Sequence, residues 1–257
     1  MKLVVFTIVK NGMPFLPSIF FTLQSTKLDW MWIVAEGSSR NTHCTSWCQE
    51  QQPGHSEDGT MEFLDMVKNH PRVIITTEEM WDGKVEMCNA CLERIGHDCV
   101  LMQMDADELW RPDNIEKVVG FFDKEPSLRA IMFPCRYFLG VNIVSTRDNS
   151  YGNNPGEWLR AWRFTPGDKF ERHEPPQLRQ KSIGRIMDLR WMGGEDGMFN
   201  HYAWWSENQC AYKELFYGYS GALDHWRRLQ ANTSFPILRL KSFLPWVDGA
   251  ASADRLP

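Results

Sequence analysis

The feature that most constrains the fold is an alternation of short apolar runs with helical segments in the first half of the chain. Four apolar runs have the length and composition of buried strands, and they cover residues 3–9, 30–35, 72–76 and 99–104. Segments with helical features separate them, one ending near residue 25 and the others covering about 60–69 and 83–95. Strands that alternate with helices pair in parallel, so the pattern predicts an α/β fold with a mostly parallel sheet covered on both faces.

The second half of the chain has a different pattern. A helix is predicted to start near Pro112, and residues 129–146 and 157–164 read as longer strands. The segment HEPPQLRQK, residues 173–181, reads as a loop. Residues 204–229 are helical in pattern and rich in aromatic side chains. These features predict that the sheet becomes mixed in its second half.

Composition excludes several classes of function. The net charge of -5 and the pI of about 5.8 argue against a nucleic-acid partner. No run reaches the roughly 18 apolar residues of a membrane span, and residues 1–15 read as a strand rather than a signal peptide. Cys88 and Cys91 are predicted to lie on a helix and pack as small apolar side chains rather than bind zinc. Unpaired cysteines favour a reducing compartment, the cytoplasm.

Three carboxylates follow the fourth apolar run. In LMQMDADELW, residues 101–110, Asp105, Asp107 and Glu108 come directly after the predicted strand. In open α/β sheets ligands bind beyond the carboxyl ends of the strands. If the chain stays extended, Asp105 and Asp107 face the same side and suit a divalent cation such as Mn²⁺ or Mg²⁺. The alternative is that Asp107 only caps the next helix.

An ordered set of short motifs carries a resemblance to a known family. In chain order the motifs are FTIVKNG (6–12), VAEGSSRNT (34–42), GKVEMCNACLERI (83–95), MDADELW (104–110), LRAWRF (159–164), RHE (172–174) and FNHYAWWSENQCAYKELFYG (199–218). Together they resemble the glycosyltransferase A fold, a Rossmann-like fold, and in particular family-two-like enzymes that transfer sugars from nucleotide-sugar donors. The chain departs from that pattern at Glu36, where the family usually has aspartate.

The resemblance implies a domain organisation and a set of binding residues. We predict one domain over residues 1–247, with a nucleotide-binding half at 1–110, an acceptor-binding half at 111–247 and a flexible tail at 248–257. The implied metal ligands, in the D-x-D motif and beyond it, are Asp105, Asp107 and His201. The implied donor-binding residues are Glu36, Lys84, Asp105, Arg160 and Arg163. For His201 the alternative is a core histidine, and for the two arginines it is a salt-bridged sheet surface.

The catalytic base has two candidates. Glu174 stands at the His-Glu position of the family, and Asp196 lies in WMGGEDGMFN, residues 191–200, which resembles the Gly-Glu-Asp segment of a related branch. A carboxylate takes the proton of an acceptor hydroxyl better if burial raises its pKa. Glu174 is slightly favoured, and Asp196 stays open.

The sequence therefore predicts a metal-dependent glycosyltransferase. It moves a sugar from a UDP- or GDP-sugar to the hydroxyl of a glycan or other acceptor, with inversion implied by the resemblance alone. Two alternatives remain open at this stage. One is a sugar-phosphate nucleotidyltransferase, and the other is a non-catalytic, metal-dependent carbohydrate-binding protein. Donor sugar, nucleotide base, acceptor and oligomeric state do not follow from the sequence.

Overall fold

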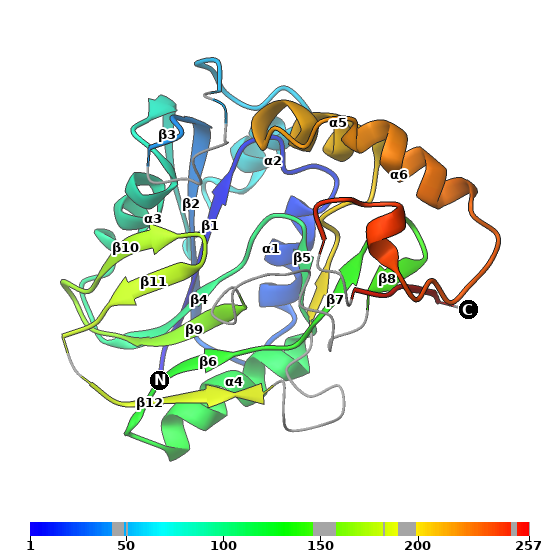
Figure 1. Ribbon diagram of the computed structural model, residues 1–257. Coiled ribbons are helices and arrows are strands. Elements are labelled where there is room, and N and C mark those ends of the chain that lie inside the picture. The colour runs from blue at the N-terminus through cyan, green and yellow to red at the C-terminus, as the bar shows by residue number, and fades with distance from the viewer. Residues whose placement is uncertain are drawn as a thin grey trace.

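The computed structural model describes residues 1–42, 49, 51–145, 158–181, 183–189, 199–247 and 251–256. Its largest element is a seven-stranded sheet in the order β12-β6-β9-β4-β1-β2-β3 (Figure 1). The strands are β1 (Leu3–Val9), β2 (Trp30–Ser39), β3 (Val73–Trp81), β4 (Cys99–Gln103), β6 (Leu128–Met132), β9 (Leu159–Phe164) and β12 (Arg185–Asp188). Of these, β9 alone runs antiparallel to its neighbours. The prediction of a mixed, mostly parallel α/β sheet is confirmed.

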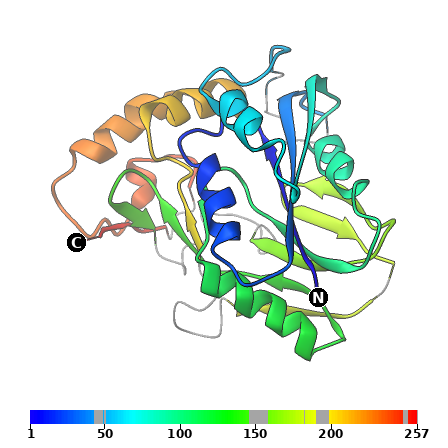
Figure 2. The same cartoon turned by 180° about the vertical axis from the view of Figure 1, so that it is seen from behind.

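Helices cover both faces of this sheet, as Figures 1 and 2 show from opposite sides. One core lies under α1 (Leu16–Gln24), α2 (Thr60–Val67) and α4 (Pro112–Lys124). The other core lies under α3 (Lys84–Leu92) and the hairpin of β10 (Lys169–His173) and β11 (Pro176–Arg179). Alternate residues of β1 enter different cores, because side chains of a strand alternate between faces.

A smaller sheet lies beside the first, in the order β14-β8-β7-β13-β5. Its strands are β5 (Glu108–Leu109), β7 (Cys135–Phe138), β8 (Ile143–Ser145), β13 (Phe199–His201) and β14 (Asp254–Arg255). The helices α5 (Glu207–Phe216) and α6 (Ala222–Ala231) lie along its upper side in Figure 1. Buried side chains of both helices and of the 3-10 helix η2 (Leu240–Ser242) form a third core. In the described part of the chain, no helix has the length and apolar content to span a membrane.

Three sequence-based expectations differ from the structure. The single strand expected over 129–146 is broken into β6, β7 and β8. The loop expected over 173–181 includes β11, which pairs with β10 from residue 169 onward. Residues 251–256 are not a loose tail, because β14 pairs with β8 and the side chains of Ala251 and Ala253 are buried.

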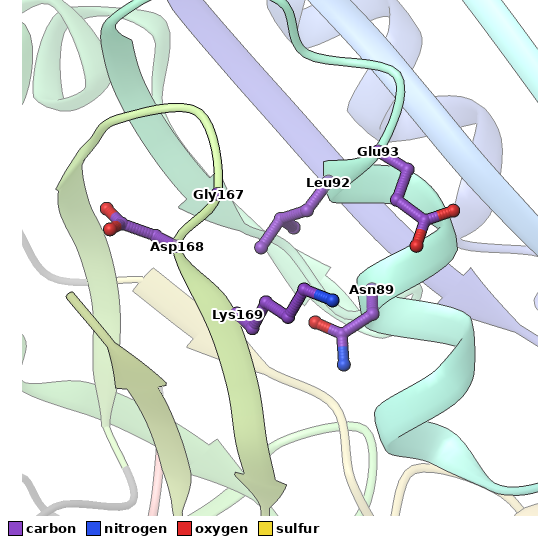
Figure 3. Close-up of a pocket in the computed structure, with 6 residues that line it drawn as sticks. All are labelled: Asn89, Leu92, Glu93, Gly167, Asp168 and Lys169. Carbon is purple, nitrogen blue, oxygen red and sulfur yellow. The ribbon is translucent and has the colours of Figure 1, made fainter. Parts of the chain in front are cut away.

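A side-chain amide joins α3 to the hairpin. Asn89 accepts a hydrogen bond from the Phe170 amide at 2.8 Å and donates one to the Phe170 carbonyl at 3.1 Å. Beside it, Lys169 extends toward Asn89 at the edge of a small pocket of about 50 Å³ (Figure 3). Ligand pockets usually hold about 300–1,000 Å³. This pocket is therefore too small for a nucleotide sugar.

A β-bulge in β3, opposite Gly37 of β2, depends on that glycine. The register between β2 and β3 shifts between Glu36 and Ser38, and Gly37 has a φ of 134°. A Cβ at Gly37 would lie 1.8 Å from the backbone oxygen of Glu78. Neither the conformation nor the space tolerates a side chain.

Gly37→Ala should therefore lower the free energy of unfolding by at least about 3 kcal/mol, because both backbone strain and overlap must be relieved. Gly120→Ala is the matched control, since Gly120 lies inside α4 with nothing within 4 Å of an added Cβ. It should stabilise the protein by about 0.5–1 kcal/mol through helix propensity. Urea unfolding measures both changes, and equal effects of the two variants would contradict the role given to Gly37.

Candidate active site

The acidic segment after β4 forms a turn. The amide of Glu108 donates to the carbonyl of Asp105 at 3.0 Å, which closes a four-residue turn. The chain is not extended here, so the condition under which Asp105 and Asp107 were expected to face the same side is not met, although the two carboxylates are close enough for their charges to interact. Glu108 then begins β5, where it pairs with His201 of β13. The turn therefore brings the acidic segment to a histidine from the second half of the chain.

A buried ion pair holds this turn against the sheet. Arg160 Nε donates to Glu108 Oε1 at 2.9 Å, with the two side chains only 4% and 0% exposed. The register between β6 and β9 skips Arg160, which is the extra residue of a β-bulge and is turned toward the acidic segment. Burial raises the pKa of Glu108 to about 7, although the Arg160 guanidinium opposes this shift.

Asp107 and His201 form a second contact in the cluster of polar side chains around the acidic turn. Asp107 Oδ1 lies 3.4 Å from His201 Nε2. Burial opposes ionisation of the carboxyl, but the charge and hydrogen bond of His201 lower the pKa of Asp107 to about 2. Burial likewise opposes protonation of the imidazole, but Asp107 raises the pKa of His201. A hard oxygen and an imidazole nitrogen thus converge, and Mn²⁺ accepts both kinds of ligand.

Asp105 faces a different set of neighbours. It accepts hydrogen bonds from Gln103 Nε2 at 2.9 Å and Arg160 Nη2 at 3.3 Å. Burial would raise the pKa of Asp105, but Arg160 and then His173 lower it. Within the described ranges, no three metal-ligating side chains form a cluster able to hold an ion. Asp107 and His201 are in contact, and the ligand roles of Asp105, Asp107 and His201 stay predictions.

Lys84 and Glu174 form a further contact in this cluster. Lys84, the first residue of α3, donates from Nζ to Glu174 Oε1 and, at 2.9 Å, to the hydroxyl of Tyr217. Burial favours a neutral carboxyl, but the Lys84 ammonium prevails and lowers the pKa of Glu174. This direction is opposite to the one expected for a base in the free protein. Tyr217, at the end of α5, was missed by the sequence reading.

Polar side chains connect the Lys84–Glu174 pair to the acidic turn. Gln103 Nε2 lies 3.3 Å from His173 Nε2, and His173 Nδ1 lies 3.6 Å from Glu174 Oε1. Gln103 Oε1, His173 Nδ1 and His201 Nδ1 are buried without a hydrogen-bond partner among the described residues. Native proteins rarely leave buried polar atoms unpaired. Their concentration here marks the cluster as a place where a ligand can add hydrogen bonds.

Glu36 is placed differently from a ligand-facing residue. Its carboxylate is fully buried, and it accepts hydrogen bonds from the Ser56 amide at 2.7 Å and hydroxyl at 2.8 Å. Its second oxygen lies 2.8 Å from His55 Nδ1. These contacts pin the segment before α2 to β2. Contact of Glu36 with a nucleotide base stays a prediction, and its observed contacts are structural.

Arg163 does not join the cluster. It pairs with Val100 at the opposite end of β4 from the acidic turn. Its guanidinium donates to the carbonyls of Leu128 at 3.1 Å, Glu125 at 3.1 Å and Phe122, so it caps the last turn of α4. The predicted donor contact of Arg163 is therefore wrong. Asp196 lies outside the described residues.

Comparisons with known proteins identify the family of the chain. The family model described as glycosyl transferase family 2 matches residues 54–185, which is more than half of the chain and includes the acidic turn. The chain belongs to glycosyl transferase family 2. No curated protein matches the chain. The sequence resemblance to a family-two-like glycosyltransferase is thus confirmed.

Solved structures show likeness at low identity. TarS 1–349 of S. aureus is 16% identical, with a TM-score of 0.40, over 55% of this chain and 37% of that one. Its complex with UDP-GlcNAc is 14% identical, with a TM-score of 0.41, over 54% and 35%. The mannosyltransferase PcManGT from Pyrobaculum calidifontis, in complex with GDP-Man and Mn²⁺, is 12% identical, with a TM-score of 0.47, over 95% and 67%. The chain thus spans little more than a third of the TarS 1–349 chain.

Arg160→Met should destabilise the protein by about 3–5 kcal/mol, because it leaves the buried Glu108 carboxylate without its partner. Adding Glu108→Gln should recover part of this loss by removing the unpaired charge. Chemical unfolding of the two single variants and the double variant gives the coupling energy. Arg163→Met is the control, because Arg163 contacts neither Arg160 nor Glu108. Its effect on the free energy of unfolding should be the same with Glu or Gln at position 108. Equal costs for Arg160→Met in both backgrounds would contradict the ion pair.

Proposed function

We propose that this protein is a metal-dependent glycosyltransferase that moves a sugar from a nucleotide-sugar donor to an acceptor hydroxyl, with inversion at the anomeric carbon. The observation that carries the proposal is the acidic turn after β4, inside the matched family region, with His201, Arg160, Lys84 and Glu174 gathered around it. Carboxylates, an imidazole and ammonium groups are what recognition of a metal and a diphosphate requires.

The proposed metal is Mn²⁺ or Mg²⁺, held by Asp107 and His201. Such ions use one or two protein carboxylates and complete their shell with water and substrate phosphates. The pKa of about 2 keeps Asp107 ionised at neutral pH, as a metal ligand must be. When bound, the ion supplies positive charge that neutralises the departing diphosphate.

The base step needs a carboxylate that can accept a proton. As the acceptor oxygen bonds to the anomeric carbon, the bond from that carbon to the diphosphate breaks, and the hydroxyl proton passes to the carboxylate. In the free protein the Lys84 ammonium lowers the pKa of Glu174. A donor phosphate that drew Lys84 away would leave burial dominant and raise the pKa of Glu174, so donor binding would activate the base. Asp196 stays the second candidate.

The compartment we propose is the cytoplasm. Five cysteines of the described chain are free thiols, and all five are buried: Cys88, Cys91, Cys99, Cys135 and Cys210. Cys88 and Cys91 pack in the core beneath α3, as expected from the sequence. Buried free thiols fit a reducing environment.

Asp107→Asn should remove the effect of Mn²⁺ on nucleotide binding, because the amide keeps the shape but loses the charge that attracts the ion. The measurement is the rise in melting temperature with UDP or GDP, with and without Mn²⁺. Asp224→Asn, at an exposed carboxylate on α6, is the control and should keep the full response. A Mn²⁺-dependent shift that survives in Asp107→Asn would remove this residue from the metal site.

Glu174→Gln should keep donor binding but lose transfer, because an amide cannot take the proton. Single-turnover release of nucleoside diphosphate from the donor in the presence of an acceptor measures the chemical step, and a loss of about 10²–10⁴-fold is expected. Asp196→Asn is tested in parallel. If only that variant loses transfer, Asp196 is the base. Release of pyrophosphate from a nucleoside triphosphate would instead indicate a nucleotidyltransferase, and metal-dependent sugar binding without turnover would indicate a carbohydrate-binding protein.

A further inference from the structure

Lys213 is a second ammonium group beside the cluster, and none of the motifs read from the sequence includes a role for it. It lies on α5, four residues before Tyr217, so both side chains share one face of that helix. Its Nζ lies 5.3 Å from the ring centroid of Trp204 and 5.4 Å from that of Tyr217. Two aromatic rings therefore hold the ammonium in place.

Charges of both signs surround Lys213. Burial lowers the pKa of Lys213, the Asp107 carboxylate raises it, the Lys84 ammonium lowers it and Glu174 raises it, with a net lowering. Lys84 is neutralised by direct contact with Glu174. Among the residues that the structure describes, Lys213 makes no ion pair of this kind, although it lies close enough to Asp107 for their charges to interact.

The two ammonium groups converge on one ring. Lys84 Nζ lies 5.0 Å and Lys213 Nζ 5.4 Å from the centroid of Tyr217. Lys84 is paired with Glu174, but its ammonium still disfavours the charge on Lys213, since burial weakens the screening by water. A ligand with two negative charges beside the two lysines offsets this effect. A single carboxylate or a neutral sugar does so less well.

We propose that Lys213 binds the diphosphate of the nucleotide-sugar donor from the α5 side of the site. The inference rests on the proposed function and extends it by assigning the diphosphate a contact in the second half of the chain. If Lys213 served only to balance Asp107, the two would be expected in direct contact, as Lys84 and Glu174 are. If it served only to pack on Trp204, the charge would be dispensable.

The test measures binding rather than turnover. Isothermal titration of UDP and GDP, without metal and with Mn²⁺, is performed on the wild type, Lys213→Met and Lys213→Arg. Methionine is unbranched and only one atom shorter than lysine, but it loses the charge. It should weaken diphosphate binding at least about tenfold in both conditions, as expected for one hydrogen bond to a charged group. Arginine should retain most of the affinity.

Two controls separate a ligand contact from a structural role. Lys241→Met changes an exposed lysine on η2 and should bind as the wild type does. The melting temperature of each variant without ligand shows whether the fold is intact, and Lys213→Gln replaces Lys213→Met if the latter melts early. Added salt should weaken diphosphate binding to the wild type more than to Lys213→Met, because salt screens the attraction between the Lys213 charge and the diphosphate, which the variant lacks.

The outcomes are distinct for the two proposals. If the wild type binds neither UDP nor GDP with or without Mn²⁺, both proposals fail, since the inference rests on the function. If the wild type binds and the folded charge-removing variant binds equally well, the role of Lys213 is overturned while the proposed function stands. If the charge-removing variant binds more weakly and Lys213→Arg does not, the inference holds.

Discussion

The buried pair of Arg160 and Glu108 is the interaction on which the rest of the site depends. A carboxylate with no exposed surface is costly unless a cation meets it directly. Arg160 does so from a bulge in β9, and this contact fixes where β5 begins. Because β5 pairs with β13, the same contact also places His201. One ion pair thus joins the large sheet to the small sheet at the point where the proposed ligands bind.

In the turn that this pair stabilises, the two aspartates contact different partners. The hydrogen bond from the Glu108 amide to the Asp105 carbonyl curls the chain. Asp105 is then directed to Arg160 and Gln103, and Asp107 to His201. A D-x-D motif in an extended chain would present two equivalent carboxylates. In this turn they have different partners, so the arginine-bound one and the histidine-bound one are suited to different tasks.

Much of the first half of the fold was predictable from sequence, because strands buried on both faces are continuous apolar runs. β1 to β4 and the helices between them follow from that pattern. The breaks among β6, β7 and β8 were not predictable, because their pairing with β13 and β14 is made by distant segments. The contact of Lys84 with Glu174 spans 90 residues for the same reason. The misplacement of Arg163 has another cause, since its side chain is used to satisfy carbonyls at a helix end.

The pairing of charges also explains how a site so rich in ionisable groups remains folded without its ligand. Lys84 is neutralised by Glu174, and Arg160 by Glu108 and Asp105, so most buried charge is already compensated. A ligand that carries its own negative charge must then exchange partners with Lys84 or Arg160 in order to contact them. Such exchange couples binding to chemistry, because a carboxylate released from its lysine regains the proton affinity that burial confers. Under the proposed function a diphosphate makes this exchange possible, whereas a neutral sugar leaves every pair as it is.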